Sequence, residues 1–189
     1  MATDLHLQKL ALRFSYLDRD GDGFIEHADY ESAAHRVRER LGHDLDHDAS
    51  RAYREAFMEL WFGLLRVMDT DGDERISKDE FVAATSRGIV DRPGGFEKVL
   101  GRVRDAFLDM GDRDGDGRLT AEEFGHLFHA LGVSLKHTAV AFAALDTDGD
   151  GHVTREQLGQ ALEDFYLSDS VDAPGHLLFG PLDSAGDAS

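Results

Sequence analysis

The sequence predicts an all-α protein that contains four helix–loop–helix units arranged in two pairs. A twelve-residue pattern with aspartate at positions 1, 3 and 5 occurs four times, beginning at residues 18, 69, 112 and 146. Apolar residues before and after each copy recur at intervals of three and four residues, the spacing of an amphipathic helix. Hydrophobic residues make up 41% of the 189 residues and only 3 are proline, so the chain can bury a core and form helices.

The repeated pattern has the ligand chemistry of a site for a hard cation. Ca²⁺ takes six to eight oxygen ligands at about 2.3–2.6 Å, and a tight loop directs alternate side chains toward one centre. Positions 1, 3, 5 and 12 supply side-chain oxygens, position 7 supplies its backbone carbonyl, and position 9 usually acts through water. We expect Ca²⁺, with Mg²⁺ as a second possibility, at these residues: Asp18, Asp20, Asp22, Phe24, Glu26 and Asp29; Asp69, Asp71, Asp73, Arg75 and Glu80; Asp112, Asp114, Asp116, Arg118 and Glu123; Asp146, Asp148, Asp150, His152 and Gln157.

The first unit surrounds the loop at 18–29. Apolar stripes over Leu10–Leu17 and Tyr30–Leu41 predict its two helices. The loop closes with Asp29, which is one methylene shorter than glutamate and cannot easily supply two oxygens to a large ion. Glu26 at position 9 can add a carboxylate, directly or through water. Because a smaller shell of six oxygens suits Mg²⁺, we expect this loop to discriminate least against Mg²⁺.

The second unit contains the strongest apolar stripe of the chain, over Tyr53–Met68, followed after its loop by a stripe over Phe81–Ile89. Glu74 stands at position 6, where the sharp turn favours glycine. We expect Glu74 to adopt a left-handed backbone conformation at a cost on the order of 1 kcal/mol, while the loop still fills with Ca²⁺. A cluster of turn-forming residues at 91–95 ends the N-terminal pair, which occupies residues 1–90.

The C-terminal pair occupies residues 95–167. In its first unit, stripes over Phe96–Phe107 and Phe124–Leu131 flank the third loop. This loop alone combines three aspartates, glycine at position 6 and glutamate at position 12, so we expect it to be the tightest Ca²⁺ site.

The fourth unit begins with Ser134 as the N-cap of a helix over Leu135–Leu145, and a stripe over Leu158–Phe165 follows the loop. Its position 12 is Gln157, which offers one neutral oxygen in place of an anion that could bind with two. Glu156, at position 11, points away from the loop. We therefore expect the fourth loop to be the weakest site.

The loops also predict how the units combine. Each has an aliphatic residue at position 8, and these residues should form short antiparallel pairings between neighbouring loops. The expected pairings are Ile25 with Ile76 and Leu119 with Val153.

An apolar segment at 168–182 follows the last unit. Such residues rarely stay exposed together, and a turn at Pro174–Gly175 could fold the segment back onto the helices. We expect it to dock where a target helix would lie in a calcium sensor, and we expect residues 183–189 to be disordered. The apolar residues of the segment are Leu177, Leu178, Phe179 and Leu182.

With these loops and helices, the chain resembles the EF-hand superfamily. The loops begin 51, 43 and 34 residues apart. This uneven spacing and the apolar tail are similar to sarcoplasmic calcium-binding proteins and to prokaryotic calerythrin, and the resemblance covers roughly Leu5 to Leu182. It implies that both pairs pack into one compact body that binds calcium without a dedicated target, and it assigns the ligand roles to the loop positions given above.

The charge of the chain supports cation binding and excludes several partners. The chain has 38 acidic and 20 basic residues, a net charge of −18, and 15 of the acidic residues occupy ligand positions. A field of this sign repels nucleic acids and anionic membranes. There is no cysteine, no signal segment and no run of 18 apolar residues, so we expect a cytoplasmic protein, and we expect a monomer.

Two further groups of residues imitate metal sites. Asp44, Asp46 and Asp48 resemble the start of a fifth loop, but the turn glycine and the aliphatic residue are missing, so we expect a linker in which Asp46 or Asp48 caps the next helix. Two histidine pairs have a spacing that one helical face could use for zinc or nickel, but such pairs arise by chance among 10 histidines. They are His43 with His47 and His126 with His129.

The composition favours a calcium buffer or transporter over the alternative, a sensor that exposes a groove to a partner protein. Adaptable sensor grooves are rich in methionine. This chain has 4 methionines and 12 phenylalanines, which fit a fixed and closed core better. We do not expect an enzyme, because the clustered carboxylates are already assigned to the loops.

Overall fold

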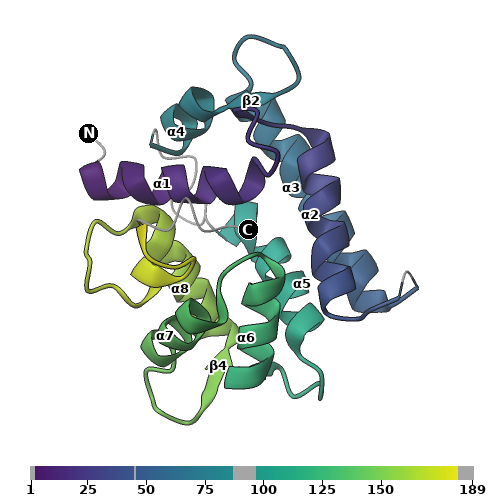
Figure 1. The fold of residues 1–189 in the computed structure, drawn as a ribbon, viewed down its shortest axis with the longest axis vertical. Helices are drawn as coiled ribbons and strands as arrows, with labels where there is room; N and C mark the ends of the chain where they lie inside the picture. Colours follow the sequence, from purple (N-terminus) through teal and green to yellow (C-terminus); the bar gives the residue numbers. More distant parts are fainter. Residues whose placement is uncertain (1–2, 45, 87–96, 183–189) are drawn as a thin grey trace.

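The computed structural model describes residues 3–44, 46–86 and 97–182, which form eight α-helices and two short antiparallel sheets (Figure 1). The all-α fold class is therefore confirmed. The helices are α1 (Asp4–Leu17), α2 (His27–Arg40), α3 (Asp48–Met68), α4 (Lys78–Ser86), α5 (Arg102–Gly111), α6 (Ala121–Ala130), α7 (Leu135–Leu145) and α8 (Arg155–Leu167). The strands are β1 (Phe24–Ile25), β2 (Ile76–Ser77), β3 (Arg118–Thr120) and β4 (His152–Thr154), and the short helical segments are η1 (Glu97–Gly101) and η2 (Pro174–Leu177).

The strands lie inside the loops and join them in twos. β1 pairs with β2 and β3 pairs with β4, both antiparallel. Both predicted pairings of aliphatic residues are confirmed, Ile25 opposite Ile76 and Leu119 opposite Val153. All four side chains are buried, so each sheet also contributes two aliphatic side chains to the hydrophobic core.

The helix boundaries agree with the apolar stripes in most places. The Ser134 side chain accepts a hydrogen bond from the His137 N–H, as expected of an N-cap. The capping prediction for α3 is wrong: its N-cap is His47, without a side-chain hydrogen bond. Asp48 lies inside the first turn, where its carboxylate pairs with Arg51 instead. The predicted turn cluster at 91–95 lies outside the described residues, as do the last residues of the second stripe and Phe96.

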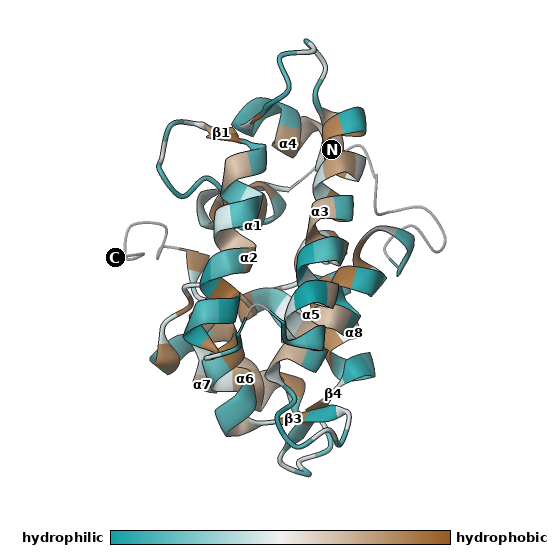
Figure 2. Ribbon diagram, turned by 90° about the vertical axis from the view of Figure 1, so that its right-hand side faces the viewer, coloured by the Kyte–Doolittle hydropathy of each residue, from teal (hydrophilic) through white to brown (hydrophobic). Residues whose placement is uncertain are grey.

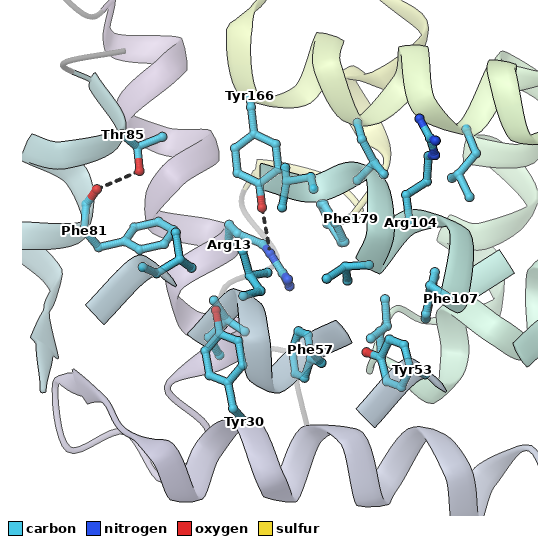
Figure 3. A pocket seen from close by; sticks show the side chains of 18 of the residues that line it. Arg13, Tyr30, Tyr53, Phe57, Phe81, Thr85, Arg104, Phe107, Tyr166 and Phe179 are labelled. Atoms are coloured by element: carbon cyan, nitrogen blue, oxygen red, sulfur yellow. Dashed lines mark hydrogen bonds between the residues drawn. The ribbon is translucent and has the colours of Figure 1, made fainter. Parts of the chain in front are cut away.

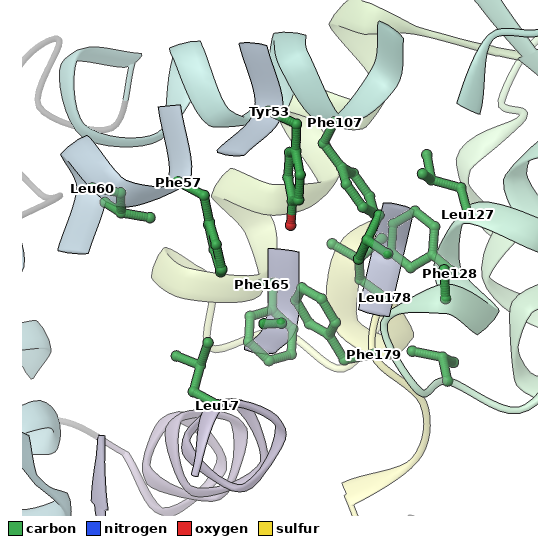
Figure 4. Packing of buried hydrophobic residues seen from close by; sticks show 14 of the residues in the cluster. Leu17, Tyr53, Phe57, Leu60, Phe107, Leu127, Phe128, Phe165, Leu178 and Phe179 are labelled. Atoms are coloured by element: carbon green, nitrogen blue, oxygen red, sulfur yellow. The ribbon is translucent and has the colours of Figure 1, made fainter. Parts of the chain in front are cut away.

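The two pairs share one core, which confirms the compact body. Helix α3 of the N-terminal pair packs against α5 of the C-terminal pair, and the rings of Tyr53 and Phe107 lie 5.7 Å apart across this contact. Tyr30 of α2 stacks on Phe57 at 4.4 Å, and Phe107 meets Phe128 of α6 edge to face at 5.6 Å. Figure 4 shows the rings of Tyr53, Phe57, Phe107 and Phe128 converging on the same interior.

The C-terminal segment contacts this core directly. Leu178 and Phe179 are 0% and 3% exposed, and the Phe179 ring lies 4.8 Å from that of Phe165. The Tyr16 hydroxyl donates to the Phe179 carbonyl at 3.0 Å. A side chain at Gly175 would place its Cβ 1.9 Å from the Ala161 carbonyl oxygen, so glycine is needed for the segment to lie this close to α8.

The start of the C-terminal segment is also held by the buried side chain of Lys9. Lys9 of α1 is 0% exposed and donates to the Ser168 carbonyl at 2.8 Å. Leu177 and Leu182 are partly buried, and residues 183–189 lie outside the described part of the chain. The outer helices show hydrophilic and hydrophobic residues side by side (Figure 2), and no helix among the described residues is long and apolar enough to cross a membrane.

Candidate calcium-binding loops

Acidic side chains converge in each of the four loops. One oxygen from each of three acidic residues lies within 4.8 Å of the others, and the groups are partly exposed. Three carboxylates this close repel one another unless a cation or a donor lies between them, and hard oxygen donors are what Ca²⁺ and Mg²⁺ prefer. The groups are Asp18, Asp20 and Asp22; Asp69, Asp71 and Asp73; Asp112, Asp114 and Glu123; and Asp146, Asp148 and Asp150.

The aspartate at position 1 organises each loop. In the third loop, the N–H groups of Gly115 and Gly117 both donate to Asp112 at 2.8 Å. In the second loop, Asp69 accepts from the N–H of Glu74 at 3.1 Å, so Glu74 takes the place of the glycine at position 6. Glu74 has a φ of 65°, and it is the sole described residue other than glycine with a positive φ. The left-handed conformation predicted for it is confirmed.

The residue at position 12 also belongs to the helix that follows the loop. Glu123 is the third residue of α6; its Oε2 accepts from the Thr120 N–H and its Oε1 from the Arg113 N–H, both at 2.9 Å. This capping box fixes the carboxylate over the loop before any ion binds. Burial opposes ionisation of Glu123, but these N–H donors outweigh it and lower its pKa.

Glu80 has the same arrangement in the second loop. It accepts from the Thr70 N–H at 2.7 Å and from the Ser77 N–H at 2.9 Å. These two backbone donors hold the pKa of Glu80 down to about 2, so the carboxylate is charged throughout the physiological range. Glu80 lies outside the group of three aspartates in its loop.

The first loop closes differently. Asp29 Oδ2 accepts from the Glu26 N–H at 2.8 Å, and burial raises the pKa of the Asp29 carboxyl. Glu26 is the N-cap of α2, forms a capping box with Asp29, and lies 3.9 Å from Arg75 across the loop pair. The Glu26 carboxylate therefore already interacts with a helix N-terminus and a cation.

Gln157, at position 12 of the fourth loop, turns its side-chain nitrogen rather than its oxygen toward the loop. Its Oε1 accepts from the Thr154 N–H at 2.7 Å and from the Thr154 hydroxyl at 3.0 Å. Its Nε2 consequently faces the loop and donates to Asp148 at 3.3 Å. A cation in this loop would meet an amide N–H at position 12 unless the side chain rotated and gave up its cap.

Two arginines at position 7 are a feature that the sequence reasoning missed, because it used only the backbone carbonyls of these residues. Arg75 pairs with Asp73 at 2.9 Å and lies over the Phe24 ring at 3.9 Å. Arg118 pairs with Asp116 at 3.1 Å and with Asp150 of the neighbouring loop at 3.3 Å. Asp116 thus turns toward Arg118 and lies outside the acidic group of the third loop. The signal that could have revealed these pairs is a basic residue two positions after an aspartate.

The remaining candidates form no comparable cluster. The rings of His43 and His47 stack at 4.0 Å. Within the described ranges, the groups of three or more possible metal-ligating side chains are those of the four loops, which include neither the histidine pairs nor the imitation of a fifth loop.

Paired helix–loop–helix units joined through short strands, with acidic loops of this geometry, define an EF-hand protein. A family model for an EF-hand domain pair matches residues 7–86, and models for single EF-hands match residues 103–129 and 139–168. The chain is 31% identical over 167 residues to calerythrin of Saccharopolyspora erythraea, covering 88% of this chain and 94% of calerythrin. It therefore belongs to the calerythrin family of EF-hand calcium-binding proteins.

Other relatives extend this similarity. A sarcoplasmic calcium-binding protein of Perinereis vancaurica tetradentata is 29% identical over 95% of this chain and 99% of its own length. The structure of a Streptomyces coelicolor calcium-binding protein has 32% identity and a TM-score of 0.78, covering 87% of this chain and 99% of that chain. The amphioxus sarcoplasmic calcium-binding protein, at 20% identity, a TM-score of 0.77 and coverage of 96% and 99%, shares the fold.

Proposed function

We propose that the chain is an intracellular Ca²⁺ buffer or transporter with up to four sites. The observation that carries this proposal is the burial of Leu178 and Phe179 of its own tail in the shared core. A sensor needs an apolar groove that a partner can enter after calcium binds. Here the chain itself covers apolar surface next to α8, and a target would have to displace it.

The tail contacts are strong enough to oppose weak targets. Each fully buried side chain of this size contributes roughly 1.5–3 kcal/mol, before the entropy lost in ordering the segment. The carbonyl of Phe179 also accepts from Tyr16, and that of Ser168 from Lys9, so backbone as well as side chains hold the segment.

The order of affinities that we propose follows from position 12. The third loop is the tightest site, because Glu123 already lies within 4.8 Å of Asp112 and Asp114. The fourth loop is the weakest, because Gln157 turns its N–H toward the ion position. The first loop, closed by Asp29, discriminates least against Mg²⁺.

A second candidate function is regulation of a partner protein. The Streptomyces coelicolor relative, 32% identical to this chain, is described as acting in prokaryotic calcium-mediated regulation. In this alternative, calcium loading would release the tail and open the surface beneath it.

The two functions differ in what calcium exposes. We expect fluorescence of a neutral hydrophobic dye to stay flat when Ca²⁺ is titrated into the full chain, with calorimetry counting the filled sites with and without millimolar Mg²⁺. Truncation after Ser168 should raise dye binding in the Ca²⁺-loaded state and lower the melting temperature. A rise of dye fluorescence in the full chain on calcium addition would favour the regulatory function.

Phe179→Ala tests the tail without removing it, and Val171→Ala is the matched control, because Val171 belongs to the same segment but is 62% exposed. Only the first should increase dye binding. Equal behaviour of both variants and the wild type would contradict the proposed role of the tail.

A further inference from the structure

A partly open cavity of about 90 Å³ lies between the two EF-hand pairs (Figure 3). Its walls are mainly aromatic and aliphatic side chains of α1, α3, α5 and α8, and Phe179 of the tail closes one side. Because the walls are apolar over most of their surface, water has few partners there.

The exception is a cation in the wall. Arg13 of α1 donates from Nε to the Tyr166 hydroxyl at 3.0 Å, and its guanidinium carbon lies 4.9 Å from the centre of the Phe179 ring. Among the described residues, no carboxylate forms an ion pair with Arg13. The second arginine of the cavity, Arg104, is in contrast paired with Glu97 at 2.8 Å and Asp105 at 2.7 Å.

Arg13 is partly exposed, and a guanidinium without a counter-ion in such a place carries a desolvation cost. Removing a charge from water without a counter-ion is costly, and an apolar residue of the same length would fill the site at lower cost. The hydrogen bond to Tyr166 uses one of the five N–H donors of the side chain, and the ring of Phe179 compensates in part. The remaining donors are available to an anion.

Two tyrosines add neutral donors. Tyr30 and Tyr53 line the cavity and are 1% and 2% exposed, and their hydroxyl groups make no hydrogen bond within the described part of the chain. Figure 3 shows both hydroxyls turned toward the space around Arg13. Burial raises the pKa of both phenols, so they remain protonated and can donate.

We propose that this cavity binds a small apolar monocarboxylate, with its carboxylate on Arg13 and the two tyrosine hydroxyls and its apolar body among the aromatic walls. One guanidinium offsets one negative charge, and its planar fork matches the geometry of a carboxylate. A doubly charged phosphate would leave one charge uncompensated in an apolar site. This inference does not depend on whether the protein buffers calcium or regulates a partner.

The test compares three probes of nearly equal shape, hexanoate, 1-hexanol and hexylamine, on the full chain saturated with Ca²⁺. Binding is followed by saturation-transfer NMR and by shifts of the amides next to the cavity. We expect hexanoate to bind at least about tenfold more tightly than 1-hexanol, because a hydrogen bond to a charged group contributes more than one between neutral groups. Hexylamine, with the same charge sign as Arg13, should not bind.

Arg13→Met keeps the apolar stem and removes the charge. It should abolish the preference for hexanoate over 1-hexanol while leaving the melting temperature unchanged or higher. Arg66→Met is the matched control, because Arg66 lies exposed on α3 and outside the cavity, and this variant should bind hexanoate like the wild type.

If Arg13→Met does not fold, Tyr53→Phe removes one donor alone and should weaken the binding of hexanoate severalfold. Equal binding of hexanoate and 1-hexanol by the wild type, or no binding of hexanoate, would overturn the proposal.

Discussion

Replacement of Gln157 by glutamate should convert the loop that we propose to be the weakest into a stronger calcium site. In the wild type, the oxygen of Gln157 accepts from Thr154 at 2.7 Å and its nitrogen faces Asp148. A carboxylate has two oxygens, so one can keep the cap while the other faces the ion. Glu123 already shows this arrangement in the third loop, with one oxygen on Thr120 and the other facing the loop.

The size of the effect follows from the added charge. A divalent cation and a carboxylate about 4 Å apart attract by about 2 kcal/mol even at the dielectric constant of water, which corresponds to roughly 30-fold in affinity. The new carboxylate also repels Asp146, Asp148 and Asp150. This repulsion is uncompensated in the metal-free protein, whereas a bound cation offsets it. We therefore expect the melting temperature to fall without calcium and to rise with it.

Site-specific titration measures this change. The Gly151 N–H donates to Asp146 at 3.0 Å, so its NMR signal reports on the fourth loop and not on the others. Gln160→Glu adds the same charge on the exposed face of α8 and serves as the control. If Gln157→Glu left the affinity of the fourth loop within twofold of the wild type, or if Gln160→Glu had an equal effect, the reasoning from position 12 would be refuted.

Four more changes test single residues. Glu123→Gln should weaken the third loop by about tenfold or more, because it removes a charged ligand and a charged cap, and calorimetry would show the loss of the site that we propose to be the tightest. Asp29→Glu should raise the selectivity of the first loop for Ca²⁺; an unchanged response to Mg²⁺ in competition titrations would count against the argument. Glu74→Gly should stabilise the metal-free protein by up to about 1 kcal/mol in denaturant unfolding, since glycine accepts a positive φ. Gly175→Ala should lower the melting temperature, because its methyl group would lie 1.9 Å from the Ala161 carbonyl oxygen.

The loops and their pairing could be predicted because their information is local. An ion site that is built within twelve consecutive residues requires particular residue types at particular positions. The aliphatic residue at position 8 likewise indicates the pairing of neighbouring loops. The stripes located the helices for the same reason. They could not locate the start of α3 at Asp48, because the residues before the stripe show no apolar periodicity and their helical state is favoured by pairs such as Asp48 with Arg51.

The cavity could not be predicted from the stripes. Tyr53 and Phe57 are both apolar-face residues of α3, and periodicity does not distinguish a side chain that fills space from one that borders a void. Arg13 lies on α1 between apolar residues, and a lone basic residue in such a stripe is usually extended to solvent. Only the arrangement of α1 against the tail shows that its guanidinium points inward.

Because the third and fourth loops share an arginine, metal loading there would be an exchange of cations. Arg118 lies between Asp116 and Asp150, so it compensates part of the charge of both loops before calcium arrives. A calcium ion that takes Asp116 as a ligand displaces the arginine, which then has Asp150 as its remaining partner. An ion entering the fourth loop would then compete with this guanidinium for Asp150. Through one side chain, the charge state of each loop would thus affect the other.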